Sequence, residues 1–147
     1  MRSITISQAA SQPTLSLRLR ALNIVLWILQ ALLAALFLWH GQFMVAPPAD
    51  MVAIVDANIG PHFRVFIGVA EVLAAAGLIL PGLTRILPSL TALAGAGLMI
   101  VMGSATVFHL FRGETASAIS AAIIFALISL VACMRWKVAP IRPRNQA

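Results

Sequence analysis

Four polar side chains of this 147-residue chain lie within or at the ends of long apolar segments: His40, Arg64, Glu71 and His109. A charged group at the centre of a bilayer costs about 2.5–3.5 kcal/mol on insertion scales, so such residues usually face a protein interior and have a partner there. Imidazole and carboxylate groups take up and release protons, and a guanidinium holds anions. The four residues are therefore the candidate intramembrane polar or ligand-binding cluster.

Arg64 and Glu71 are seven residues apart, which is two helical turns or about 10 Å along one face of a helix. We expect Arg64 to reach along the helix toward Glu71, directly or through a water. Gly68 and Ala75 share this face and let a neighbouring helix approach closely. Two roles are open for Glu71: a polar clamp between helices, or a proton-responsive carboxylate that contacts a ligand.

His40 and His109 each lie near the end of an apolar segment, and in a bundle they would share a level with Arg64. One interpretation is that both are interfacial histidines anchored to loop carbonyls. The other is that they relay protons or hydrogen-bond a ligand near neutral pH. Two histidines without a close carboxylate or cysteine are too few for a metal or haem site, so none is predicted.

Apolar residues dominate the chain: 61% are hydrophobic and 10% charged, against about 45–50% and about 25% in soluble domains. The bilayer must therefore be its solvent. A span needs about 20 apolar residues, and four segments meet this length: 21–45, 62–81, 88–111 and 116–134. Short connections make consecutive helices antiparallel. The sequence predicts an all-α integral membrane four-helix bundle with up-down topology.

The flanking segments divide the rest of the chain. Residues 1–20 are predicted to be a mobile N-terminal leader, 21–135 the transmembrane domain and 136–147 a basic cytoplasmic tail without structure. Pro47 and Pro48 open an outer loop to Pro61, whose middle forms a short turn at the interface.

The distribution of basic residues predicts the orientation. Only Arg64 and Arg112 would lie outside if both termini are inside, and short basic loops stay in the cytoplasm. The remaining basic residues would lie inside: Arg2, Arg18, Arg20, Arg85, Arg135, Lys137, Arg142 and Arg144. We expect an N-in, C-in multi-pass protein of a bacterial-type cytoplasmic (inner) membrane. The net charge of +6 does not indicate nucleic acid, because no basic stripe with interleaved aromatic residues is present.

Small residues should determine how the helices pack. Gly68, Ala75 and Gly77 permit close contact between helices of the chain or between protomers of a homo-oligomer. Gln30, deep in the first helix, should make an interhelical hydrogen bond.

Several stretches resemble the DoxX-like family of small membrane proteins. They are the run from Arg64 to Glu71, the segment Gly77 to Pro81, the run Ala94 to Met102 and the turn His109 to Glu114 with its Arg112-Gly113-Glu114 motif. The resemblance implies a four-helix bundle.

On the family's pattern, Glu71 would be the intramembrane carboxylate, and Arg64, His109, Arg112 and Glu114 the outer polar set. One departure concerns the end of the first helix. Many members have a lysine soon after its glycine, whereas here Gly41 is followed by Gln42, Phe43 and Met44. A site that depends on that cation is therefore in doubt.

The resemblance also implies a function, because the family takes its name from subunits of quinone-linked oxidoreductases that accompany a separate catalytic chain. We expect a non-catalytic subunit or accessory of such a system, with quinone as the cofactor and a redox enzyme as the partner. Two alternatives are a structural or assembly factor of the membrane and a small proton-coupled transporter that acts as an oligomer.

Overall fold

The computed structural model describes residues 5–144, which form helices and no strand. The elements are α1 (Thr5–Val45), α2 (Ala49–Ile59), α3 (Pro61–Thr84), α4 (Ser89–Phe111), α5 (Thr115–Cys133) and a π-helical turn, η1 (Met134–Val138). Four stretches are long and apolar enough to cross a membrane: Leu17–Val45, Pro61–Thr84, Ser89–Phe111 and Thr115–Val138. The predicted all-α membrane fold is confirmed.

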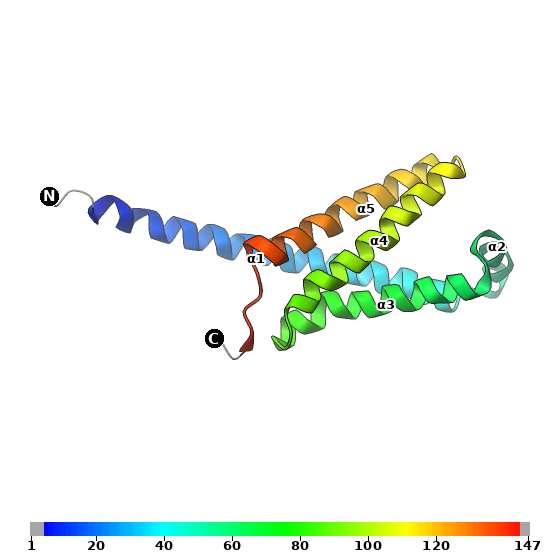
Figure 1. Ribbon diagram of the computed structural model, residues 1–147, viewed down its shortest axis with the longest axis horizontal. Helices are drawn as coiled ribbons and strands as arrows, with labels where there is room; N and C mark the ends of the chain where they lie inside the picture. The colour runs from blue at the N-terminus through cyan, green and yellow to red at the C-terminus, as the bar shows by residue number, and fades with distance from the viewer. Residues whose placement is uncertain (1–4, 145–147) are drawn as a thin grey trace.

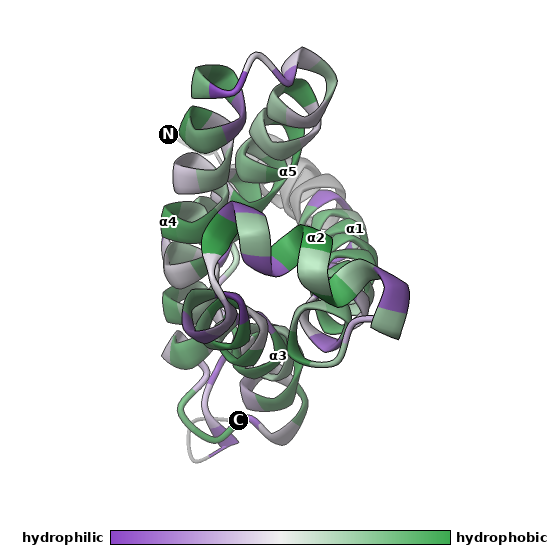
Figure 2. Cartoon of the chain, turned by 90° about the vertical axis from the view of Figure 1, so that its right-hand side faces the viewer, coloured by the Kyte–Doolittle hydropathy of each residue, from purple (hydrophilic) through white to green (hydrophobic). Residues whose placement is uncertain are grey.

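The helices form two antiparallel hairpins, α1 with α3 and α4 with α5 (Figure 1). The hairpins meet where α3 connects to α4, and they separate toward the opposite end. We call the first end, which holds Arg85, Arg135 and Arg144, the basic end. The opposite end, which holds His40, Arg64 and His109, is the histidine end. Helix α2 lies across the histidine end, as the view along the bundle shows (Figure 2).

Glycines set the distance between helices. A Cβ on Gly68 would lie 2.7 Å from the carbonyl oxygen of Gly41, so α1 and α3 touch backbone to backbone there. A Cβ on Gly77 would lie 2.8 Å from the Cβ of Ala94, which brings α3 against α4. Ala75 is buried in the core. Close packing within the chain thus accounts for the small residues on α3.

The element boundaries differ from the prediction in three places. Helix α1 begins at Thr5, so residues 5–20, predicted as a mobile leader, are helical; residues 1–4 lie outside the described part. Extending an existing helix adds one hydrogen bond per residue fixed, and only Pro13 opposes it. The short turn of the outer loop is an 11-residue helix, α2, bounded by Pro48 and Gly60. The expected tail begins with η1, after which residues 140–143 have no regular structure.

Candidate functional site

Glu71 and His40 form an ion-pair-like contact between α3 and α1. The Oε2 atom of Glu71 lies 2.6 Å from Nδ1 of His40. The Gly41–Gly68 approach places these two residues opposite each other, since His40 precedes Gly41 and Glu71 follows Gly68 by one turn. The Glu71 side chain is fully buried, whereas that of His40 is 37% exposed. The buried carboxylate is thus joined to a partly accessible imidazole.

One oxygen of this carboxylate has no partner. Among the described residues nothing hydrogen-bonds Oε1 of Glu71, although it is buried. Buried polar atoms are nearly always hydrogen-bonded in native proteins, so an exception calls for an explanation such as a function or a bound molecule.

Arg64 makes no direct hydrogen bond to Glu71, so the direct contact expected between them is wrong. Its Nε donates to Oδ1 of Asp56 at 2.6 Å, and its Nη1 donates to the carbonyl oxygens of Met44 and Val45, the latter at 3.2 Å. The seven-residue spacing did place Arg64 on the buried face of α3 with Glu71. Helix α2 and the end of α1, however, provide nearer acceptors. Arg64 therefore fastens α2 and the last turn of α1 to α3.

We expect Arg64→Lys to lower the free energy of unfolding by about 1.5–3 kcal/mol, the usual contribution of a hydrogen bond to a charged group. A lysine carries one nitrogen and cannot reach Asp56 and both carbonyls together. Thermal unfolding in detergent and proteolysis within α2 would measure the effect. The control is Arg112→Lys, which alters an exposed pair; equal effects of the two substitutions would contradict the clamp.

The turn between α4 and α5 holds a second acid–histidine pair. Nδ1 of His109 lies 2.6 Å from Oε2 of Glu114, and Nε of Arg112 donates to Oε1 at 2.7 Å. Gly113 has φ +71°, a left-handed conformation that glycine adopts without strain. Glu114 directly precedes α5, where a negative charge is favourable. Both histidines thus pair with carboxylates and not with the loop carbonyls expected for interfacial anchors.

These contacts make the stability of the turn depend on pH. The hydrogen bonds from Arg112 and then from His109 hold the pKa of Glu114 below its ordinary value of 4.5. The contribution of Glu114 to stability is therefore present above pH 4.5 and is lost as the pH falls through the lowered pKa.

We expect Glu114→Gln to reduce the unfolding temperature slightly at neutral pH, because the group is solvent-exposed. The difference from wild type should vanish when the pH falls well below 4.5. Thermal unfolding of both proteins over this range tests it, and a difference that persists in acid would contradict the assignment.

A crevice of about 380 Å³ lies between the two hairpins at the histidine end. It is lined by His40 and His109 together with Leu36, Phe37, Met102, Ala105, Ala116, Ser117, Ser120, Ala121 and Ile124. Two histidines from different hairpins therefore line one cavity, with Glu71 behind His40. Arg64 does not line it.

Sequence reasoning missed two groups of polar residues. Ser117 and Ser120 line the crevice one turn apart on α5, and their i, i+3 spacing was the available signal. Arg135, counted only among the basic residues of the inner side, is 4% exposed and donates from Nε to Oε1 of Gln30 at 2.5 Å. Gln30 itself donates to the carbonyl oxygen of Leu78 at 2.7 Å, which is the expected interhelical bond.

Within residues 5–144, no three histidine, cysteine, aspartate or glutamate side chains lie close enough to hold a metal ion. The polar groups at the crevice are two imidazoles and two hydroxyls, with one buried carboxylate behind His40.

Comparison with known proteins gives a family. The sequence model of the DoxX-like family matches residues 28–132, which include the greater part of all four spans. No curated protein and no solved structure matches the chain. A match over more than half of the chain, together with four helices able to cross a membrane, shows that this multi-pass membrane protein belongs to the DoxX-like family.

Proposed function

We propose that this protein is a non-catalytic membrane subunit that holds a quinone head group in the crevice and serves a separate redox enzyme. The observation that carries the proposal is the pairing of buried Glu71 with His40, which lines the crevice opposite His109. Family membership supports it, because the family name derives from subunits of quinone-linked oxidoreductases.

The crevice fits such a head group in size and lining. Small-molecule sites have volumes of about 300–1,000 Å³ and mostly apolar walls with a few placed polar groups. Here Phe37, Met102 and Ile124 are apolar walls that exclude water, and two histidines and two serines supply the polar atoms. The unpartnered Oε1 of Glu71 adds a proton acceptor behind His40.

The contacts of each histidine indicate which ring nitrogen could bind a ligand. Nδ1 of His40 and of His109 faces a carboxylate, so Nε2 of each ring is left for a ligand. A protonated ring donates from Nε2 to a carbonyl oxygen, and a neutral ring accepts a hydroxyl proton there. Glu71 can receive a proton from His40 through the Nδ1–Oε2 contact.

A bound quinone would supply two-electron, two-proton redox chemistry, and the protein would manage its protons. Histidine, serine and glutamate do not carry electrons, so the proposal requires a redox enzyme as partner. By the positive-inside rule we place the basic end in the cytoplasm and the crevice toward the outer side of a bacterial-type inner membrane.

Purification of the tagged protein from its own host in a mild detergent tests the proposal. Mass spectrometry and solvent extraction should then find a stoichiometric redox enzyme and bound quinone. Ala105→Phe should fill the crevice and remove the quinone, whereas Ala122→Phe on the exposed face of α5 should retain it. A protein that carries lipid alone, without partner or quinone, would refute the proposal.

Glu71→Gln separates a proton-handling role from a purely structural one. The amide keeps the shape and one hydrogen bond to His40, so the fold should survive. Quinol oxidation by the purified complex should fall by about 100-fold or more, the usual contribution of a general acid or base. Asp50→Asn is the control at an exposed carboxylate outside the crevice. Loss of thermal stability with unchanged turnover would make Glu71 a clamp.

The second candidate, a structural or assembly factor, is favoured by the contacts of Arg64. They fasten α2 and the ends of two helices without facing the crevice. Its test is the same purification, with assembly partners in place of a redox enzyme and no quinone.

A further inference from the structure

The basic end contains a buried arginine that has no acidic partner. Arg135 is 4% exposed; its Nη1 donates to Oδ1 of Asn23 at 2.7 Å and to the carbonyl oxygen of Ala139 at 3.2 Å. Its guanidinium also lies 5.4 Å from the Trp27 ring. Within the described chain, its buried Nη2 has no hydrogen-bond partner. A buried cation normally has an anion, and none of these neighbours is one.

In the part of the chain that the structure describes, no acidic side chain lies at this end. Its four acidic residues are Asp50 and Asp56 of α2, Glu71 of α3 and Glu114 of the α4–α5 turn. Each lies in the half of the bundle toward the histidine end, or across that end. Within residues 5–144 the basic end therefore has no acidic side chain as a counter-charge.

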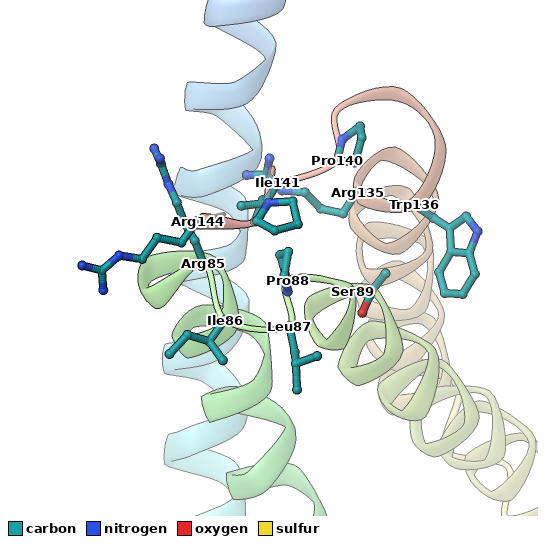
Figure 3. Close-up of a pocket in the computed structure, with 12 residues that line it drawn as sticks. Arg85, Ile86, Leu87, Pro88, Ser89, Arg135, Trp136, Pro140, Ile141 and Arg144 are labelled. Atoms are coloured by element: carbon teal, nitrogen blue, oxygen red, sulfur yellow. The ribbon is translucent and has the colours of Figure 1, made fainter. Parts of the chain in front are cut away.

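Arg135 lines a pocket of about 860 Å³ that is suited to an anion. Arg85 and Arg144 lie beside each other at its edge, where the backbone N–H of Arg144 donates to the carbonyl oxygen of Arg85 at 3.2 Å (Figure 3). Helix α4 begins at Ser89 in the wall, and the N–H groups of Leu90 and Thr91 donate to the carbonyl oxygens of Leu87 and Pro88. The arginines, and not the start of this helix, are therefore the groups that would attract an anion.

We propose that this pocket binds the phosphate of an anionic phospholipid headgroup. Nη2 of Arg135 donates to a phosphate oxygen, and Arg85 and Arg144 supply long-range attraction. Basic pockets between membrane helices at the cytoplasmic surface are a known type of headgroup site.

The apolar rim of the pocket favours a lipid over free phosphate. Ile86, Leu87 and Trp136 line the same pocket and are 62%, 65% and 64% exposed. Exposed aliphatic side chains offer a surface for acyl chains, and tryptophan favours the headgroup level. A free phosphate would use the cations and leave this rim without a partner.

Thermal unfolding of the full chain in mild detergent tests the proposal, with added phosphatidylglycerol, phosphatidylcholine or inorganic phosphate as three separate arms. Phosphatidylglycerol should raise the unfolding temperature in a saturable way, and the other two should not. Equal protection by inorganic phosphate would overturn the lipid assignment. Equal protection by phosphatidylcholine would overturn the role of charge.

Two double variants distinguish lipid binding in this pocket from general electrostatic attraction of the lipid to the basic end. Arg85→Gln/Arg144→Gln should weaken the apparent affinity for phosphatidylglycerol about tenfold, and it leaves the backbone bond between the two residues in place. Arg18→Gln/Arg20→Gln removes the same charge from α1, outside the pocket, and should change the affinity less than twofold. Equal weakening by both pairs would overturn the pocket.

Arg135→Lys tests whether the buried guanidinium of Arg135 takes part in lipid binding. It retains the charge but loses the planar set of donors, so a folded variant should lose most of the saturable effect. Unchanged protection in a folded Arg135→Lys variant would remove Arg135 from the site.

Discussion

Replacing His40 with alanine should lower the free energy of unfolding in detergent by about 1–3 kcal/mol, the usual cost of leaving a buried polar group without its hydrogen bond. The reason is that both oxygens of the buried Glu71 carboxylate would then lack a hydrogen-bond partner within the described chain. Thermal or denaturant unfolding of the purified variant would measure the loss.

His109→Ala is a closely matched control. His109 makes the same 2.6 Å contact from Nδ1 to a carboxylate, but that carboxylate, Glu114, is 37% exposed and keeps Arg112 as a partner. The control should cost much less stability than His40→Ala, because exposed pairs are screened by water. Similar losses for the two variants would show that burial of Glu71 does not matter.

A double replacement shows whether the His40–Glu71 pair serves stability or quinone binding. His40→Phe/Glu71→Leu exchanges the polar pair for apolar side chains of similar size, which is often neutral or stabilising. We expect it to recover most of the stability lost in His40→Ala while quinone binding is lost. Recovery of both properties would mean that the pair has no part in the proposed site.

Gly68→Ala is the second large effect, because the added Cβ would meet backbone. It would lie 2.7 Å from the Gly41 carbonyl oxygen and 2.8 Å from Cγ2 of Val45. A backbone atom cannot move aside as a flexible side chain can, so α1 and α3 must separate. Overpacking of this kind costs about 1–3 kcal/mol, which should lower the unfolding temperature by several degrees.

Gly97→Ala makes the same chemical change on α4, where a Cβ would meet nothing within 4 Å. It should leave the unfolding temperature unchanged or slightly higher, because alanine favours helix more than glycine. If Gly68→Ala is as stable as Gly97→Ala, the close approach of α1 and α3 is not required.

The membrane spans could be predicted because hydropathy reports directly on them. Hydrocarbon allows only segments that satisfy their own backbone, so apolar length and the breaks at Pro61 and Gly113 located the helices. The buried face of α3 was also predictable, since the spacing of Arg64, Gly68 and Glu71 follows from helical geometry alone.

The pairing of side chains could not be predicted. His40 meets Glu71 only because the Gly41–Gly68 contact sets the rotation of α1 relative to α3. That rotation cannot be predicted from the residue pattern of a single sequence. Arg64 was assigned to Glu71 because α2 was expected to be mostly loop. Once α2 folds, Asp56 is the nearer acceptor.

The V-shaped arrangement of the two hairpins has a mechanical consequence (Figure 1). Because they meet at the basic end and separate at the histidine end, any rotation about the α3–α4 connection would change the distance between His40 and His109 more than distances near the connection. The width of the crevice is therefore the dimension of the molecule most sensitive to the angle between the hairpins.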